Sequence, residues 1–416
     1  KAKRLSIANE KSSAEISGKK SIYFSNGLSV NDNSKVEMAS PSIRVEGDSS
    51  NGLVNISSQS SVKLGGNDLF VTGGLNIANS TLTATETGTL ELGKKDAYNC
   101  FTVTNSQVSL GSETSQLHLY GNIRSSVSSQ VDIHGQEILI DGVHIRKNSS
   151  DWTSTDSILT NNDVISVGDN DSNVWLKGRL FNTGSDVTVN GRTIHISVAD
   201  VINSDAGKGK YSQYAIEGTG DDKTKTTIGN ENTESLLIDG ATWINHGSLW
   251  MHGKNIDLSY AKGIALIGSN HEYHNPSKGT SLLAGGKETE NLTIKGQVAN
   301  IGAAEMQLSG QHITIDSTGY DGSEKGGLYP ESLLALSNDI YAGTKDTQTI
   351  SISSGFHAMG GGIKVLGKNI TVGTSSYFRN KAQSGGGTLQ TGYIAYAKGN
   401  NVDIGSDDAD TAPFYG

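Results

Sequence analysis

Two groups of residues in the sequence carry chemistry that could bind a metal ion. His271 and His274 enclose Glu272 and Tyr273, but zinc proteases need two histidines four residues apart on one helical face. Pro276 follows closely, and no helix is expected there. Acidic residues near the C-terminus, and in two earlier turns, could offer oxygen ligands to calcium. These acidic residues are Asp403, Asp407, Asp408, Asp410, Asp169, Asp171, Asp221 and Asp222. Solvated acidic turns are their simpler interpretation, and we predict no metal or other cofactor.

Aromatic residues are concentrated in polar stretches of the chain, although aromatics make up only 6% of the composition. The stretches are 146–162, 203–225, 269–290, 318–347 and 374–397. Tyr and Trp rings offer flat apolar area with a polar tip, which suits sugar faces and protein hot spots. Packing of the rings onto the body of the protein is the structural alternative. The predicted ligand-binding residues are Trp152, Tyr211, Tyr214, His271, Tyr273, His274, Tyr320, Tyr329 and Tyr377.

These stretches alternate with a sequence repeat that sets their spacing. The repeat closes on a glycine followed by an alternating apolar segment, as in Gly135-Gln136-Glu137-Ile138-Leu139-Ile140. The closing glycines follow one another at nearly equal steps along the chain: Gly135, Gly191, Gly253, Gly310 and Gly367. Self-similarity at a fixed period is typical of a repeat architecture.

Short β-strands are the elements that the repeat predicts. Apolar-x-apolar triplets alternate with polar residues and are bounded by Gly, Asn, Ser and Asp, and no helical periodicity is sustained. Within each copy, the first and last triplets are separated by a nearly constant offset, which predicts that they stack as equivalent strands of neighbouring coils. The expected pairs are Leu117 with Ile138, Val174 with Ile194, Leu236 with Ile256, Leu292 with Ile313, and Ile350 with Ile370.

The fold class that follows is all-β, a right-handed parallel β-helix with stacked loop insertions. Gly is frequent at 52 residues and Pro rare at 4, as tight corners and uninterrupted hydrogen-bond ladders require. We predict an irregular or capping segment over 1–20, then one continuous β-solenoid over 21–416, with super-repeats of about 57 residues from about 111. Insertions at the same point of each period are expected on one side of the solenoid.

Composition excludes some functions. A net charge of −10 and a pI near 5.5 argue against nucleic-acid binding, which favours a basic face. Cys100 is the single cysteine, so no intramolecular disulfide can form, and a small buried side chain is its simplest interpretation. The chain does not begin with Met, and we expect it to be a piece of a longer protein.

The chain resembles the passenger domains of bacterial autotransporters and related type V secreted adhesins. The resemblance rests on the Gly-Lys-Asn-Ile-x-Leu type of coil, at Gly253 to Leu258 and Gly367 to Val372, on the Ser, Thr, Asn and Gly surface, and on the scarcity of Cys and Pro. It covers essentially the whole chain and is architectural. It implies a cell-surface or secreted location in a Gram-negative type of bacterium and an outer-membrane translocator barrel in the parent chain. No family site residue carries over.

We therefore expect a surface-displayed adhesin without enzyme activity. Its expected partners are host or bacterial surface glycans or matrix proteins, or further copies of itself in auto-aggregation or biofilm. A polysaccharide-degrading β-helix enzyme is the alternative, and it would need two carboxylates across the scissile bond, supplied by neighbouring coils. No hydrolase motif of that kind or of the Gly-x-Ser-x-Gly kind is evident. A structural spacer of a longer passenger is the third interpretation.

Overall fold

The computed structural model of the chain describes most of the sequence and divides it into two compact units. The described residues are 2, 4–8, 11–46, 54–95, 100–142, 156–199, 214–220, 223–269, 281–301, 305–317, 332–335, 339–359, 361–373, 375–378, 389–393, 395–398 and 402–405. The units are Lys1–Gln213 and Tyr214–Gly416, here called the first and the second unit. We predicted one continuous solenoid, and the continuity of the two units stays a prediction.

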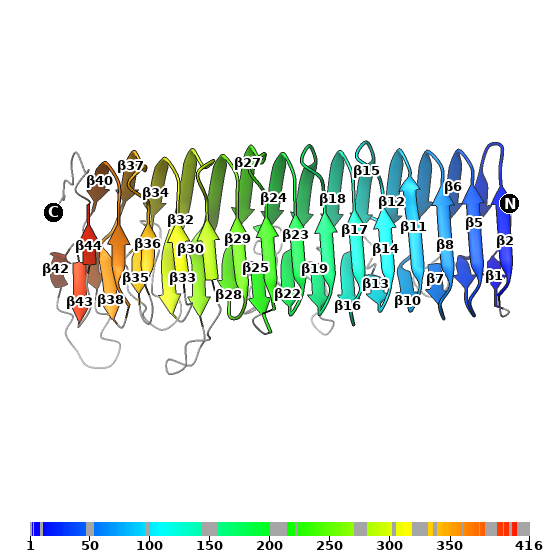
Figure 1. Cartoon of the computed structure of the whole chain (residues 1–416), viewed down its shortest axis with the longest axis horizontal. Coiled ribbons are helices and arrows are strands. Elements are labelled where there is room, and N and C mark those ends of the chain that lie inside the picture. Colours follow the sequence, from blue (N-terminus) through cyan, green and yellow to red (C-terminus); the bar gives the residue numbers. More distant parts are fainter. Residues whose placement is uncertain are drawn as a thin grey trace. The chain divides into compact units, whose positions relative to one another are not determined.

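Every named element is a β-strand, and the strands stack in parallel as a right-handed β-helix, which confirms the predicted fold class. Each coil contributes one strand to each of three rows, and a strand pairs with its equivalents in the neighbouring coils. Figure 1 shows the rows as successive arrows lying side by side, β2, β5 and β8 among them. Hydrogen bonds thus run between coils, so each coil depends on its neighbours for both its ladder and its core.

The first unit contains three such rows. Row 1 comprises β3 (Ile22–Phe24), β6 (Ser42–Val45), β9 (Asp68–Val71), β12 (Thr89–Gly93), β15 (Gln116–Tyr120), β18 (Glu137–Asp141), β21 (Asn173–Lys177) and β24 (Thr193–Ser197). Row 2 comprises β1 (Leu5–Ile7), β4 (Leu28–Val30), β7 (Val54–Ser57), β10 (Leu75–Ala78), β13 (Cys100–Thr104), β16 (Asn122–Ser126), β19 (Asp156–Asn161) and β22 (Arg179–Thr183). Row 3 comprises β2 (Ser13–Ser17), β5 (Lys35–Ala39), β8 (Ser61–Gly65), β11 (Thr81–Glu86), β14 (Gln107–Leu110), β17 (Gln130–Ile133), β20 (Val164–Val167) and β23 (Asp186–Val189).

The second unit repeats the scheme, with two long strands that each serve rows 1 and 2. Row 1 holds β27 (Ser235–Asp239), the starts of β30 (Asn255–Ser269) and β32 (Asn291–Ile301), β34 (His312–Asp316), β37 (Thr349–Ile352) and β40 (Asn369–Val372). Row 2 holds β25 (Tyr214–Thr219), β28 (Ala241–Ile244), the ends of β30 and β32, β35 (Leu333–Ala335), β38 (Phe356–Met359) and β43 (Ala395–Lys398). Row 3 holds β26 (Lys225–Ile228), β29 (Ser248–Met251), β31 (Ser281–Ala284), β33 (Glu305–Leu308), β36 (Ile340–Ala342), β39 (Ile363–Val365) and β44 (Val402–Ile404). Outside the rows, β41 (Ser375–Phe378) pairs antiparallel with β42 (Leu389–Tyr393).

The strand registers match the expected stacking of the apolar triplets. Leu117 pairs with Ile138 and Val174 with Ile194 in the first unit. The other three predicted pairs are present in the second unit. Alternation places the flanking residues of each triplet inward: Leu117 and Leu119 are fully buried, and His118 between them points out. Because a shift of one residue would turn the apolar set outward, this pattern fixes the register.

The long period of the sequence repeat arises because long and short coils alternate. Along row 1 of the first unit, Val174 stacks on Ile138 at the end of a long coil, and Ile194 stacks on Val174 at the end of a much shorter one. The long coil carries the polar insertion between β18 and β19. A turn that opens on a glycine precedes β15 and another precedes β21. These glycines, Gly111 and Gly168, have φ of 73° and 80°, in the left-handed region that glycine favours.

The insertions that we expected on one side of the solenoid lie largely outside the described residues, but the strands that flank two of them belong to different rows. In the second unit, residues 318–331 join row 1 to row 2, between β34 and β35, whereas residues 270–280 join row 2 to row 3, between β30 and β31. The reason is that β30 continues from its row-1 pairing directly into row 2. A polar stretch at a constant sequence spacing therefore does not by itself fix the corner at which it leaves the coil.

Segment 1–20 also differs from the irregular or capping segment that we expected. β1 pairs in register with β4, and β2 pairs in register with β5. Short alternations such as Ala14 and Ile16 suffice for strand formation here, because a neighbouring coil supplies the hydrogen-bond ladder. The parallel rows of the first unit thus begin before Lys20.

Candidate functional site

Most of the residues predicted to bind a ligand lie outside the described part of the chain: Trp152, Tyr211, His271, Tyr273, His274, Tyr320 and Tyr329. Tyr377 lies in β41, where only the backbone is described. Tyr214 opens β25, and its ring meets the ring of Trp243 edge-on, with 5.3 Å between centroids. The predicted loop site is therefore untested, and its one described ring packs against the solenoid wall.

The described strands bring together a different set of side chains, which sequence reasoning missed. It consists of the outward-facing residue at the centre of each row-1 strand of the first unit, one residue per coil, in unbroken register. We call this set the aromatic ladder. Its members are Tyr23, Arg44, Phe70, Glu91, His118, Leu139, Trp175 and His195.

The signal for the ladder was present in the sequence. Each member is the middle residue of an apolar-x-apolar triplet, such as Leu69-Phe70-Val71 or Val174-Trp175-Leu176. The triplets were used to predict the strands, and their flanking residues form the core. The middle residue of a half-buried strand points to the opposite face. Rings at five of the eight middle positions therefore mark an outer surface rather than a core: Tyr23, Phe70, His118, Trp175 and His195.

Ring contacts organise the C-terminal end of the ladder. Trp175 in β21 stacks on His195 in β24, with 5.5 Å between centroids and 8° between planes. Lys177 places its ammonium 4.2 Å from the centre of the Trp175 ring, a cation–π contact. Trp175 remains 42% exposed, although its ring contacts both His195 and Lys177. The Lys177 ammonium also lies 3.7 Å from Asp141 Oδ2.

The N-terminal end of the ladder carries a similar pairing of a cation with a ring. The Arg44 guanidinium lies 5.7 Å from the centre of the Phe70 ring. Glu46 holds this end in place, because it accepts hydrogen bonds from Arg44 Nε and from the Tyr23 hydroxyl, each at 2.5 Å. The hydrogen bond to Glu46 is the main reason that the pKa of Tyr23 is raised, with burial and the Glu46 charge adding to it.

Polar side chains run alongside the ladder as a second outward column, two residues earlier in each strand. In this column Asn173 Nδ2 donates to Glu137 Oε1 at 2.7 Å, and Thr193 Oγ1 donates to Asn173 Oδ1 at 2.6 Å. Gln116 precedes Glu137 in the same register. We call this set the polar flank: Gln116, Glu137, Asn173 and Thr193. Apolar ring faces thus lie next to ordered hydrogen-bonding groups along the same strands.

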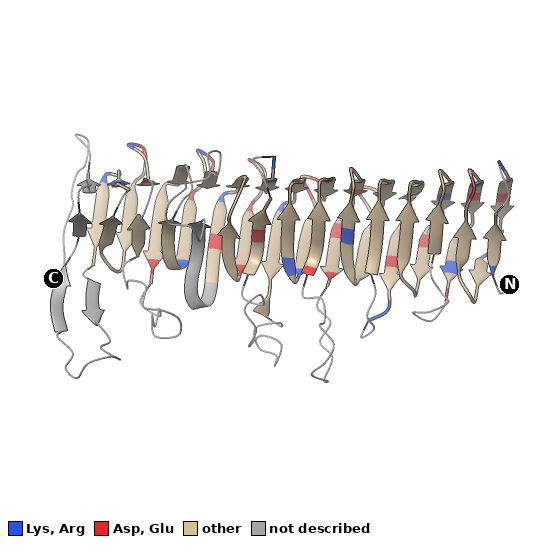
Figure 2. Cartoon of the chain, turned by 90° about the horizontal axis from the view of Figure 1, so that it is seen from below, with Lys and Arg blue, Asp and Glu red and all other residues tan. Residues whose placement is uncertain are grey.

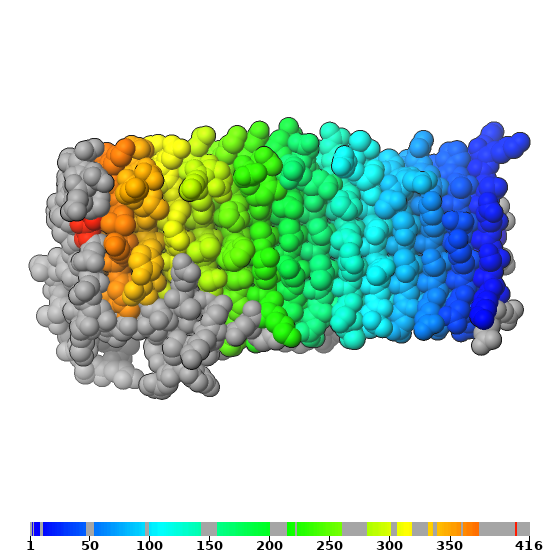
Figure 3. All heavy atoms as spheres, viewed as in Figure 1, coloured from blue at the N-terminus to red at the C-terminus, as the bar shows by residue number. Residues whose placement is uncertain are grey.

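Charges of both signs are scattered over the described strands, as Figure 2 shows, and no large block of one sign is visible on them. On the side of the first unit that faces the viewer in Figure 3, successive coils are closely packed.

Near the centre of the ladder, burial raises the pKa of Tyr120, and the charges of Glu91 and Asp141 raise it further. The surroundings of this phenol are therefore electronegative.

The second unit has its own outward aromatic column, in row 3. Trp250, Leu283, Gln307 and Tyr341 follow one another in register. Lys225 lies 5.3 Å from the centre of the Trp250 ring, and Tyr341 is well exposed. By contrast, two outward positions of row 2 in this unit, Leu334 and His357, are buried. The open apolar surface of the second unit therefore lies on row 3.

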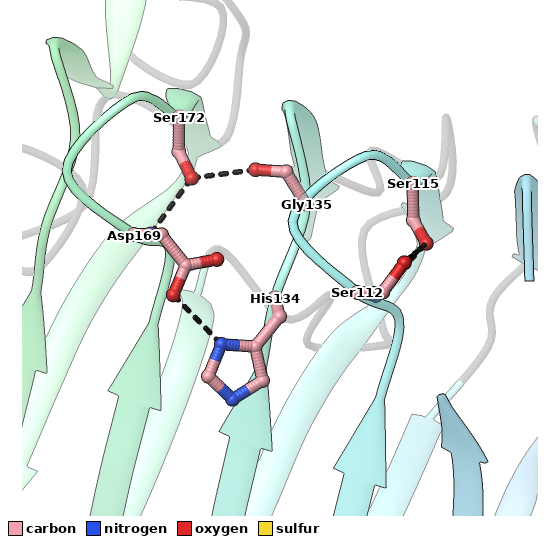
Figure 4. A network of polar contacts seen from close by, with 6 residues as sticks. All are labelled: Ser112, Ser115, His134, Gly135, Asp169 and Ser172. Carbon is pink, nitrogen blue, oxygen red and sulfur yellow. Dashed lines mark hydrogen bonds and ion pairs between the residues drawn. The ribbon is translucent and has the colours of Figure 1, made fainter. Parts of the chain in front are cut away.

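Two His–carboxylate pairs link neighbouring coils and have the composition of a catalytic dyad. His134 Nδ1 lies 2.8 Å from Asp169 Oδ1, and His252 Nδ1 lies 3.1 Å from Glu288 Oε1. Figure 4 shows the first pair beside two serine-containing turns. Nucleophilic catalysis would need a hydroxyl hydrogen-bonded to the imidazole. Ser172 instead donates to the Gly135 carbonyl at 2.5 Å and accepts from the Asp169 amide at 2.7 Å.

The serines of these turns therefore have a structural role, because their hydroxyls hydrogen-bond to backbone groups. Ser115 occupies the same place two coils earlier, where it accepts from the Ser112 amide at 2.9 Å, and Figure 4 shows Ser112 and Ser115 side by side. Thr289 and Thr347 repeat the arrangement in the second unit. Each hydroxyl satisfies one backbone amide of its own turn and one carbonyl of the coil before, which buried backbone groups require.

The candidate metal ligands of the sequence receive no support in the described part of the chain. Asp169 is engaged by His134, and no group of three His, Cys, Asp or Glu residues that could hold a metal ion occurs among the described residues. The His271 motif and the acidic residues from Asp407 onward lie outside these residues. No helix in the described ranges is long and apolar enough to cross a membrane.

No protein-family model matches the chain, and comparisons with curated proteins and with solved structures find no match either.

Proposed function

We propose that this protein is an adhesin that binds a glycan chain along the aromatic ladder and polar flank of its first unit. The observation that carries the proposal is the in-register row of outward rings, from Tyr23 to His195, on strands whose opposite side forms the core. Neighbouring strands of a sheet lie about 4.8 Å apart. Ladder positions thus recur at about the size of one sugar ring, so a linear glycan can place successive rings on successive coils.

The chemistry of the surface favours a carbohydrate over an apolar partner. A sugar ring has an apolar face of C–H groups and an edge of hydroxyls. Trp175 offers the exposed part of its ring to the apolar face, and the polar flank offers amide, carboxylate and hydroxyl groups to the edge. Aromatic side chains have few rotatable bonds, so on rigid strands they lose little conformational entropy on binding. Loops on the same scaffold are a second place where contact residues concentrate.

Surface display is part of the proposal. The β-helix fold and the scarcity of cysteine suit a passenger that an outer-membrane translocator barrel exports, at the surface of a Gram-negative type of bacterium. In that setting, host glycans, bacterial surface glycans and matrix proteins are the expected partners, and self-association in auto-aggregation or biofilm is a further expected outcome. These statements rest on the architectural resemblance and on the composition of the chain.

A glycan array probed with the purified protein tests the proposal. We expect binding to at least one polysaccharide, and we expect it to be lost in the double variant Trp175→Ala/His195→Ala. Phe181→Ala is the matched control, because Phe181 is also an outward ring in the first unit but lies in row 2. Circular dichroism checks that all variants fold. Equal binding by the double variant and the wild-type protein would overturn the ladder as the site.

Two further readouts separate the alternatives. New reducing ends in the bound polysaccharide would identify a polysaccharide-degrading enzyme. If binding survives the ladder variant but is lost on replacement of Tyr211, Tyr214, Tyr273, Tyr320 and Tyr329 by Ala, the loop surface carries the activity. Absence of binding to every glycan and matrix protein would leave the spacer interpretation.

A further inference from the structure

The centre of the aromatic ladder differs from its two ends in charge. At both ends a cation lies over or beside a ring, Arg44 near Phe70 and Lys177 near Trp175. At the centre, Glu91 lies next to His118 in register. Within the described part of the chain, Glu91 takes part in no ion pair. The centre therefore presents a carboxylate to solvent between two aromatic positions, Phe70 and His118.

The strand registers bring Glu91, His118 and Tyr120 to one part of the outer surface. Gly93 pairs with Tyr120 in the outward column two residues after the ladder. Gly93 has no side chain, and its position is buried. On its other side Tyr120 neighbours Asp141. His118 meets Tyr120 edge-on, with 6.2 Å between centroids, and thus closes the third side with a ring.

Electrostatics indicates which ligand group suits this place. Glu91, Glu137 and Asp141 surround the His118 and Tyr120 positions, and the Lys177 ammonium, 3.7 Å from Asp141, offsets one of these three charges. The raised pKa of Tyr120 is consistent with this field, since Glu91 and Asp141 both contribute to it. A carboxylate- or sulfate-bearing sugar would meet repulsion here, whereas an ammonium group next to aromatic rings is attracted by both the charges and the ring faces.

We propose that the central segment of the ladder, formed by Glu91, His118 and Tyr120, recognises a protonated amino group of a linear hexosamine polymer. The inference rests on the proposed glycan-binding function and names the class of glycan. The sugar rings would lie along the ladder, and a free amine of one sugar would face Glu91. An N-acetyl group at the same position carries no charge, so the same polymer in fully acetylated form would lose this interaction.

Two oligosaccharides that differ only in this group provide the test. Chitosan hexamer and chitin hexamer share one backbone and differ in N-acetylation. Titration calorimetry near neutral pH, where carboxylates are charged and a share of the amines is protonated, should give an affinity up to about fivefold higher for the chitosan hexamer, the magnitude expected of one partly exposed ion pair. Rising salt should reduce this preference, because screening weakens exposed charge pairs.

Variants at Glu91 and Glu37 test which residue causes the preference for the chitosan hexamer. Glu91→Gln removes the charge and keeps the shape, so it should abolish the preference for the chitosan hexamer and leave the affinity for the chitin hexamer within about twofold. Glu37→Gln is the matched control, because Glu37 is an outward glutamate of row 3 in the same unit, and it should retain the preference. Equal affinity of the wild-type protein for both hexamers, or a preference that persists in Glu91→Gln, would overturn the inference.

The outcomes also separate this inference from the function on which it rests. If the protein binds other glycans on the array through Trp175 but neither hexamer, the amine site is wrong and the proposed function stands. If no glycan binds at all, the proposed function fails first. An affinity for both hexamers that is about tenfold weaker in Trp175→Ala, with the preference kept in that variant and lost in Glu91→Gln, would support both.

Discussion

The indole of Trp175 lies flat on the imidazole of His195, although the two residues belong to different coils. The stack follows from parallel in-register pairing, which puts equivalent residues of adjacent coils side by side. His195 supports the indole from one side, and Lys177 contacts its ring. An exposed ring held in this way is pre-organised for binding, because its position is set before a ligand arrives.

Trp175→Ala should weaken glycan binding about tenfold, as loss of an aromatic contact residue commonly does. The free energy of unfolding should change by no more than about 1 kcal/mol, since Trp175 is an outward residue. Titration calorimetry and thermal melting measure the two quantities. Phe181→Ala should leave the affinity unchanged, and an equal loss of affinity in both variants would contradict the assignment.

Leu117→Ala should destabilise the protein by about 2–5 kcal/mol, because it empties a fully buried position of the core. His118→Ala, at the next residue but on the outer face, should change stability by about 0.5 kcal/mol or less. Thermal melting compares the two. Equal losses would mean that inward and outward positions of β15 are not distinguished as the register requires.

Asp163→Ala should lower the free energy of unfolding by about 2–4 kcal/mol, because it would leave buried hydrogen-bond donors without an acceptor. Asp163 is 4% exposed and accepts from Ser125 Oγ at 2.7 Å, from Thr160 Oγ1 at 3.0 Å and from the Ser129 amide at 2.7 Å. Asp163→Ser is the matched variant, since Ser185 stands at the same place in the next coil and accepts from the Asp163 amide. The melting temperature should fall less in Asp163→Ser than in Asp163→Ala. A larger fall in Asp163→Ser would disprove the role of Asp163 as a buried acceptor.

Val127→Asn should stabilise the protein by about 1 kcal/mol, because it relieves backbone strain. Val127 has φ of 64°, which a β-branched residue rarely adopts, and it is 59% exposed, so little packing is lost. Val127 follows Ser126, and the residues that follow the register partners of Ser126 in the adjacent coils are Asn105 and Asn162, with φ of 46° and 59°. Val164→Asn serves as the control, because Val164 is similarly exposed but lies in a strand; it should not raise the melting temperature, and a rise there would remove backbone strain as the cause.

Gly168→Ala should destabilise its turn by more than about 1 kcal/mol. The backbone φ is 80°, and an added Cβ would lie 2.2 Å from the carbonyl oxygen of Asn190. At Gly65, an added Cβ would meet the end of the Glu86 side chain at 3.2 Å, and a flexible side chain can move away, so Gly65→Ala should be close to neutral. Thermal melting of both variants checks the difference, and equal stability would contradict the geometry of the turn.

The fold could be predicted from the sequence because local alternation and repeat spacing point to the same answer. Alternation fixes which residues of a strand face inward, and the nearly constant offset between triplets fixes which strands pair, as Leu292 and Ile313 illustrate. The ladder was missed because the three-row coil decides which outward positions share one face. Nothing in the period distinguishes the open position of Trp175 from the buried position of Leu334.

The alternation of long and short coils has a consequence for how this surface can change in evolution. Each pair of coils is a self-contained sequence unit that adds two rungs to every column and leaves the registers above and below intact. Internal duplication or loss of one pair would therefore lengthen or shorten the ladder without disturbing the remaining contacts. The length of the ladder can therefore change in discrete steps of two coils.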